Sequence, residues 1–154
     1  MKNWESLKNA SADSIIRKFY QERPHLMVEP SVDMGNLTDW LGVEVCLAHM
    51  PMTPGRLERN PPKLYVNLSQ PQVTRRFIQA HLLGHLLLHD GDEDNLDPIK
   101  EKQAHEFACQ ILMPTAWVIN RWELGMGLPL LAATFNVSEK VLKHRALSMG
   151  LIGV

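Results

Sequence analysis

The sequence of 154 residues contains no apolar stretch near the roughly 18 residues that a membrane-spanning helix requires. Its first residues, Met1 to Glu5, lack the apolar run of a signal peptide. It has two cysteines, Cys46 and Cys109, without the spacing of a metal or redox motif. These absences favour a cytoplasmic protein with reduced thiols and no membrane partner.

A strong charge of either sign is also missing. Lysine and arginine total 16 and aspartate and glutamate total 17, so the net charge of −1 creates no overall field toward nucleic acid or an anionic membrane. Hydrophobic residues make up 45% of the chain and charged residues 21%, which is typical of a globular protein. A chain of this length can bury its own core, so we expect a single domain over residues 1–154.

Periodicity and turn residues predict a mostly helical chain with a short sheet. Apolar residues at helical spacing, bounded by proline, glycine and capping residues, indicate helices, whereas alternating or β-branched runs indicate strands. The expected helices are residues 3–23 (with a break near Ser11 or Asp13), 32–41, 72–89, 98–113, 116–124 (capped by Thr115), 128–135 and 138–149. The expected strands are residues 43–50 and 63–68, with a weak edge strand inside the connection 51–62. In the strand 63–68, alternation places Leu64, Val66 and Leu68 on one face.

Two histidines, His81 and His85, lie four residues apart inside a long apolar run. Positions i and i+4 share one face of a helix, about 6 Å apart along its axis, so both imidazoles are able to reach one metal ion. Glu101 begins the next helical pattern, in which Ala104 and Ala108 predict packing against the first helix. Two imidazoles and a carboxylate form the zinc-ligand set of one class of peptidase. The sequence therefore predicts a Zn²⁺ site at His81, His85 and Glu101.

Leu82 occupies the position where the peptidase pattern H-E-x-x-H has a glutamate. That glutamate accepts a proton from water and passes it to the leaving amine, and leucine has no titratable atom for either step. Loss of general acid–base catalysis costs on the order of 10²–10⁴ in rate. We therefore expect metal binding to be retained and proteolysis to be impaired or lost. Glu106 and His105 are the nearest substitutes, and no motif places either of them.

Two further histidines have other expected roles. His89 extends the series but lies about 12 Å from His81 along the helix axis, too far for both to bind one zinc ion, so we expect it at the helix end. His105 follows Glu101 by four residues and faces the same way. Three roles remain open for it: a histidine at the edge of the core, a hydrogen-bond partner of His81 or His85, or a fourth ligand or proton acceptor.

The segment 90–97 suggests a calcium loop. Asp90, Asp92 and Asp94 alternate, and Glu101 is twelfth from Asp90, as in an EF-hand. However, the sixth position is Asn95 rather than glycine, and a helix is expected to start at the early proline. A solvated acidic loop is the better interpretation.

At this point the sequence resembles the ImmA/IrrE metallopeptidases. The segment Arg76 to His89, RFIQAHLLGHLLLH, is similar to their active-site helix RFTLAHELGHLLLH. The segment Glu101 to Pro114 is similar to their second motif, E-x-x-A-N-x-F-A-A-x-L-L-M-P. Weaker likeness in Val66-Asn67 and in the tail around Phe135 to Ser138 extends the resemblance over roughly residues 30–154. The chain departs from the pattern at Leu82 and at His105, which replaces an asparagine.

The resemblance implies a fold, a cofactor and a partner. The fold would be α+β, with a small antiparallel or mixed sheet on a zincin-like pair of helices and a helix-turn-helix-like C-terminal cap over residues 128–154. Zinc would be bound by His81, His85 and Glu101. The protein would act on or bind a helix-turn-helix transcriptional repressor, in an anti-repressor role for a mobile element or a stress regulon. With Leu82 in place of the base, it would be a pseudoenzyme.

Two alternative functions follow from particular residues. One is an active zinc endopeptidase that cleaves the repressor with a non-standard base. The other is a DNA-binding regulator in which the helix 138–149 presents Lys140, Lys143 and Arg145. Against it, these cations also fit a solvated face over a core of Val141, Leu142 and Leu147. We do not expect nucleic acid as a partner.

Overall fold

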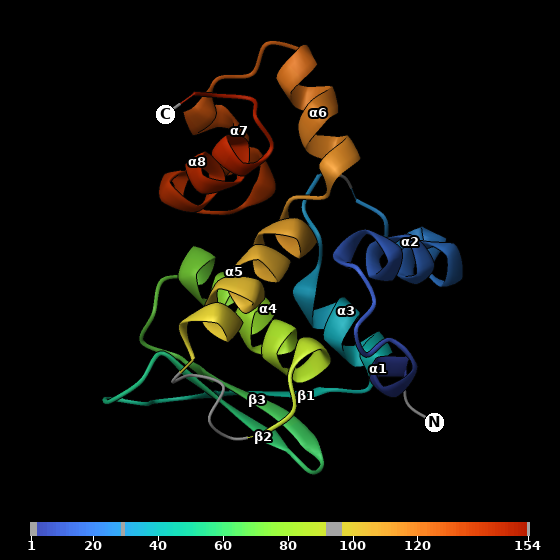
Figure 1. The fold of residues 1–154 in the computed structure, drawn as a ribbon, viewed down its shortest axis with the longest axis vertical. Coiled ribbons are helices and arrows are strands. Elements are labelled where there is room, and N and C mark those ends of the chain that lie inside the picture. Colours follow the sequence, from blue (N-terminus) through green and yellow to red (C-terminus); the bar gives the residue numbers. More distant parts are fainter. Residues whose placement is uncertain (1–2, 29, 92–96, 154) are drawn as a thin grey trace.

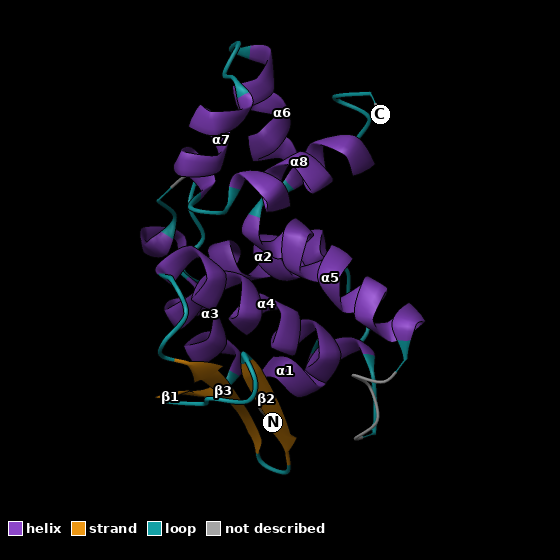
Figure 2. Ribbon diagram, turned by 90° about the vertical axis from the view of Figure 1, so that its left-hand side faces the viewer, coloured by secondary structure: helices purple, strands orange, loops and turns teal. Residues whose placement is uncertain are grey.

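A small mixed sheet lies at one end of the molecule, and helices lie on one side of it (Figures 1 and 2). The computed structural model describes residues 3–28, 30–91 and 97–153. Its strands are β1 (Glu44–Ala48), β2 (Gly55–Arg59) and β3 (Pro62–Asn67), in the order β1-β3-β2. β1 pairs with β3 in parallel and β2 pairs with β3 antiparallel. β2 is thus the edge strand that the sequence predicted within residues 51–62.

The N-terminal helices are separated where the capping residues predicted. α1 (Asn3–Ser6) and α2 (Ala12–Glu22) are distinct, because Ser11 caps α2 by accepting a hydrogen bond from the Ser14 amide. A short turn of 3₁₀ helix, η1 (Pro24–Leu26), follows. α3 (Met34–Leu41) is capped by Asp33 and ends at Gly42, whose φ of 79° is readily adopted by glycine.

The central helices are α4 (Gln72–Leu88) and α5 (Pro98–Leu112), which lie side by side, with α4 packed on the sheet (Figure 1). The chain then forms α6 (Thr115–Glu123), α7 (Leu128–Phe135) and α8 (Glu139–Ser148) at the opposite end. Asn136 turns the chain between α7 and α8 in the left-handed conformation. Within the described residues, no helix combines the length and apolarity needed to cross a bilayer.

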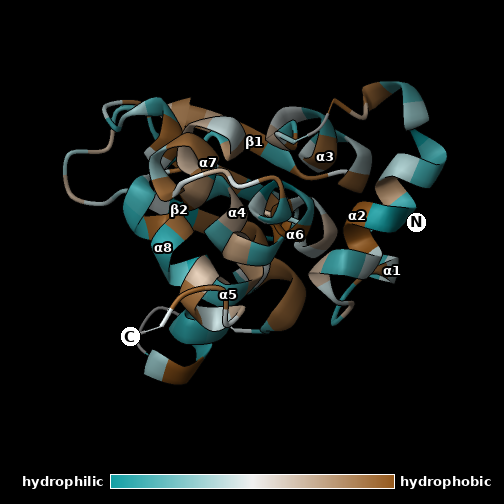
Figure 3. Cartoon of the chain, turned by 90° about the horizontal axis from the view of Figure 1, so that it is seen from above, coloured by the Kyte–Doolittle hydropathy of each residue, from teal (hydrophilic) through white to brown (hydrophobic). Residues whose placement is uncertain are grey.

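The core lies where the N-terminal helices, β3 and the α4–α5 pair meet. Fully buried side chains come from α2, α3, β3, α4, α5 and α7, among them Phe19, Leu37, Leu64, Leu83, Ile111 and Phe135. The peripheral helices α2 and α8 each carry both hydrophobic and hydrophilic residues, as Figure 3 shows. The α+β fold class predicted from the sequence is confirmed by this arrangement.

Local predictions differ from the structure at two places. Leu68 was expected in the strand, on the same face as Leu64 and Val66, but β3 ends at Asn67 and Leu68 is 52% exposed. Thr115 was expected to cap α6 but forms its first residue, and its hydroxyl instead accepts a hydrogen bond from Arg145. The predicted acidic loop falls largely outside the described residues, as do Asp92, Asp94 and Asn95 of the calcium interpretation.

Candidate metal centre

α4 presents its two histidines toward α5. The helix begins after Pro71 and ends at His89, and its run of leucine and alanine favours continuous helix. His85 is buried and the His81 side chain is 19% exposed, so both imidazoles lie at the edge of the core. The i, i+4 spacing gives ring centroids 4.9 Å apart.

α5 brings its carboxylate to the same place because its start is well defined and its packing is tight. Asp97 caps the helix by accepting from the amides of Ile99 and Lys100, and Pro98 is the first helical residue. Glu101 then lies in the first turn. Gly84 of α4 lets the two helices approach closely, since a Cβ atom there would meet the Ala104 Cα and O atoms at 3.2 Å.

The three predicted ligands converge in the structure. His81 Nε2 lies 3.0 Å from Glu101 Oε2, and His85 Nε2 lies 2.7 Å from Glu101 Oε1. One potential ligand atom from each of the three residues lies within 4.8 Å of the others. Bonds of about 2.0–2.2 Å to a tetrahedral zinc ion would place such atoms roughly 3.3–3.6 Å apart. Small side-chain rotations separate the atoms by that amount, so the donor set fits zinc.

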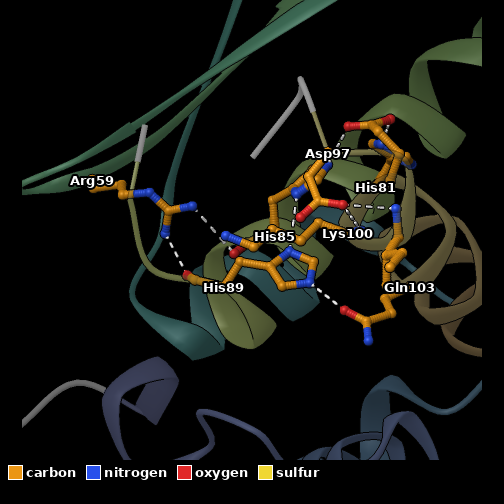
Figure 4. A network of polar contacts seen from close by, with 9 residues as sticks. Arg59, His81, His85, His89, Asp97, Lys100 and Gln103 are labelled. Carbon is orange, nitrogen blue, oxygen red and sulfur yellow. Dashed lines mark hydrogen bonds and ion pairs between the residues drawn. The ribbon is translucent and has the colours of Figure 1, made fainter. Parts of the chain in front are cut away.

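His85 is held by a chain of side chains (Figure 4). Gln103 Oε1 lies 2.8 Å from His89 Nε2 and accepts a hydrogen bond from it. In the His89 tautomer that donates through Nε2, the Nδ1 atom, 3.1 Å from His85 Nδ1, accepts a hydrogen bond from the latter. The remaining His85 nitrogen, Nε2, consequently directs a lone pair toward Glu101, as a metal ligand requires.

The backbone around this chain is also anchored. Arg59, at the end of β2, donates to the His89 carbonyl at 2.8 Å and to the His85 carbonyl at 3.4 Å. These contacts tie the last turn of α4 to the sheet. His89 lies at the helix end, as expected, but its contact with His85 was missed by the sequence reasoning. The spacing of four between the two histidines was the available signal.

His81 lacks comparable support. Its Nδ1 is buried and has no hydrogen-bond partner among the described residues. Burial lowers the pKa of His81, while the Glu101 carboxylate opposes this shift. A neutral imidazole is the form that binds a metal ion, so this environment also fits the zinc-ligand role.

The metal centre opens into a cleft of about 830 Å³. The edge strand β2 and α4 supply most of its walls, and Phe77, Ile78, Leu82, Gly55 and Leu57 contribute apolar surface. Leu82 is 9% exposed and approaches the strand, since a Cβ on Gly55 would lie 3.1 Å from its Cδ1. The position expected to hold a base therefore presents an apolar branch to the cleft.

Neither suggested substitute base is among the described residues that line this cleft. Glu106 Oε1 lies 2.8 Å from Nε2 of His144 in α8. His105 makes ring contacts with Phe77 and His144 and, among the described residues, no hydrogen bond to His81 or His85. No observation thus favours a non-standard base.

The DNA-binding alternative loses one of its three cations. Arg145 is buried and donates to the Met113 carbonyl oxygen at 3.1 Å and to Thr115. Lys140 and Lys143 are exposed on α8. Arg145 therefore fastens α8 to the end of α5 and is not part of a basic surface.

Comparison with known proteins agrees with this geometry. A family model described as the IrrE N-terminal-like domain matches residues 39–147. A Mycobacterium tuberculosis transcriptional regulator has a similar structure, with a TM-score of 0.58 and 15% identity over 87% of this chain and 51% of that chain. The chain spans about half the length of that protein, and at this identity the likeness shows a shared fold alone. No curated protein sequence gives a significant match. Because the family model covers more than half of the chain, this protein belongs to the IrrE N-terminal-like domain family.

Proposed function

We propose that this protein is a zinc-binding, peptidase-like anti-repressor that binds a helix-turn-helix transcriptional repressor and is impaired or inactive in cleaving it. One observation supports it above the others: His81, His85 and Glu101 converge beside a cleft, while Leu82 occupies the position of the general base. The site retains its donor set and lacks its proton acceptor.

The residues of the site explain why the protein would bind zinc and yet be impaired in cleavage. Zinc, when bound, supplies Lewis acidity toward a carbonyl oxygen and a water molecule. His81, His85 and Glu101 would hold it, and the His85–His89–Gln103 chain keeps the His85 lone pair directed toward it. Of the described residues that line the cleft, Glu101 is the one with a carboxylate, and it belongs to the ligand set. Among the described lining residues, the cleft therefore holds no separate carboxylate to move the proton.

The cleft has the form that an extended peptide segment needs. β2 is an edge strand in the order β1-β3-β2, so its outer backbone groups are available to pair with a peptide strand. Apolar side chains of α4 form the opposite wall. A repressor segment in extended conformation would lie between them, with its backbone close to Glu101.

Metal content and substitutions at His85 and Leu82 test this function. Purified protein supplied with zinc should contain about one equivalent that depends on His85, and the His85→Ala variant should lose it. Leu82→Glu should raise hydrolysis of a candidate helix-turn-helix repressor by on the order of 10²–10⁴. Leu82→Gln is the matched control, because glutamine has the size of glutamate but no carboxylate to accept a proton. This variant should stay inactive.

Three outcomes test the metal centre, the missing base and the partner separately. Protein that takes up no zinc at this site would refute the metal centre and with it the proposed function. A zinc-loaded, folded Leu82→Glu variant that remains inert would show that the missing base does not explain the lack of activity. Failure of the wild-type protein to retain the repressor in a pull-down would refute the partner.

A further inference from the structure

A second group of metal-binding side chains lies between α5 and α8. His105 and Cys109 are four residues apart on one face of α5, and α8 supplies His144. One potential ligand atom from each lies within 4.8 Å of the others. The His105 and His144 rings meet edge to face, with centroids 4.5 Å apart. Helices distant in sequence thus bring two imidazoles and a thiol together.

One buried nitrogen of this group has no hydrogen-bond partner among the described residues. The Cys109 side chain is fully buried, and His105 Nε2 is buried without a hydrogen-bond partner among the described residues. Most buried polar nitrogens in folded proteins have such a partner, so an unpartnered one in a residue grouped with a thiol and a second imidazole fits the role of a metal ligand. Burial also lowers the pKa of His105, which keeps its imidazole neutral.

Glu106 orients the third member of the group. Its Oε1 accepts from Nε2 of His144 at 2.8 Å. A neutral His144 that donates through Nε2 has its lone pair on Nδ1, and a carboxylate that holds the other nitrogen is the usual support of a metal-bound histidine. The His144 side chain is 43% exposed, which leaves it room to adjust.

We propose that His105, Cys109 and His144 bind a zinc-class divalent transition metal ion at a second site, which fastens α8 to α5. One thiolate and two imidazoles suit zinc and cobalt and disfavour magnesium and calcium, which prefer oxygen ligands. A tetrahedral ion places such atoms roughly 3.3–3.6 Å apart, so the three atoms, now within 4.8 Å of one another, would have to approach by at most about 1.5 Å. Binding releases the thiol proton, and a water molecule completes the coordination.

Two of the three proposed ligands do not occur in the second motif of the ImmA/IrrE metallopeptidases. In the motif E-x-x-A-N-x-F-A-A-x-L-L-M-P, the positions of His105 and Cys109 are asparagine and alanine. The Phe77 ring lies between the two centres, with its centroid 5.9 Å from that of His81 and 5.0 Å from that of His105. The second site therefore adjoins the first but uses none of its ligands.

Cobalt titration of the full chain tests this proposal independently of the first site. In the His81→Ala/His85→Ala background, metal-free protein should bind one Co²⁺ and develop the near-ultraviolet sulfur-to-cobalt charge-transfer band. Added Cys109→Ala should abolish the band, whereas Cys46→Ala, which removes the other cysteine, should leave it intact. Zn²⁺ should bleach the cobalt spectrum and raise the Tm of the background variant, and Cys109→Ala should remove that rise.

The band is specific to sulfur, so it does not depend on zinc or repressor binding at the first site. Absence of the band in the background variant, or its survival in Cys109→Ala, would overturn the proposal. If Cys109→Ala fails to fold by circular dichroism, the partly exposed His144→Ala decides instead. An unchanged band and cobalt affinity in that variant would overturn the proposal equally.

Discussion

The close approach of α4 and α5 at Gly84 makes this glycine a sensitive test of the site's construction. Alanine at position 84 would place its Cβ 3.1 Å from Phe107 Cδ1 and 3.2 Å from the Cα and O atoms of Ala104. The Ala104 contacts are to backbone, which has little freedom to move within a packed pair of helices. The Gly84→Ala variant should therefore push α4 and α5 apart.

Two opposing effects set the change in the free energy of unfolding of Gly84→Ala. Alanine favours a helix interior over glycine by roughly 0.8–1 kcal/mol. Overpacking a well-packed core costs roughly 1–3 kcal/mol. The free energy of unfolding of Gly84→Ala should therefore fall by up to about 2 kcal/mol, and zinc affinity should fall with it because Glu101 moves away from His81 and His85.

Urea unfolding of the metal-free protein measures the first effect, and competition with a chelating dye measures the second. Gly35→Ala is the matched control: Gly35 is an exposed helical glycine of α3, and a Cβ there would contact only a side-chain oxygen, Asp33 Oδ1, at 3.3 Å. It should keep more of the helix-propensity gain, because its one tight contact is to an exposed side chain and not to the backbone of a packed helix. A Gly84→Ala variant as stable as Gly35→Ala, with unchanged zinc affinity, would refute this account of the helix contact.

Three other substitutions give separate expectations. His89→Ala removes the acceptor that orients His85 and should weaken zinc binding about 10–100-fold, whereas the exposed His49→Ala should not; equal affinities would contradict the role of His89. Burial raises the pKa of the Cys109 thiol to about 12, so the unfolded chain, with a thiol pKa of about 8.5, loses this proton first as pH rises. Between about pH 8.5 and 12, the free energy of unfolding of the metal-free protein should therefore fall by about 1.4 kcal/mol per pH unit. Urea unfolding at several pH values measures this slope, and Cys109→Ala should remove it. Arg145→Met leaves a buried carbonyl oxygen unpaired and should lower the free energy of unfolding by about 1–3 kcal/mol, so an unchanged urea midpoint would argue against it.

Local chemistry made much of the fold predictable from sequence. Ser11, Asp33, Gly42 and Pro98 mark helix ends because capping and backbone restrictions act within a few residues. The prediction for Leu68 was wrong because strand length depends on partners: β3 ends at Asn67, opposite the last paired residue of β1. Its alternation with Leu64 and Val66 continued past that point without a sheet to bury it.

The interpretation of Thr115 went wrong for a related reason. A threonine after proline suits a helix cap locally, but the hydroxyl accepts from Arg145, a residue of a distant helix. No pattern in the sequence near Thr115 predicts that contact.

By itself, the sequence determined that His81 and His85 share a helix face and that Leu82 leaves the motif without a base, because both follow from the helical period and side-chain chemistry. Tertiary packing decided the rest. The contact between α4 and α5 brought Glu101 to the imidazoles, and the contact between α5 and α8 brought Cys109 to His144, although the cysteine spacing had indicated no metal site. Such contacts depend on how helices that are distant in sequence pack together, and local periodicity does not determine that packing.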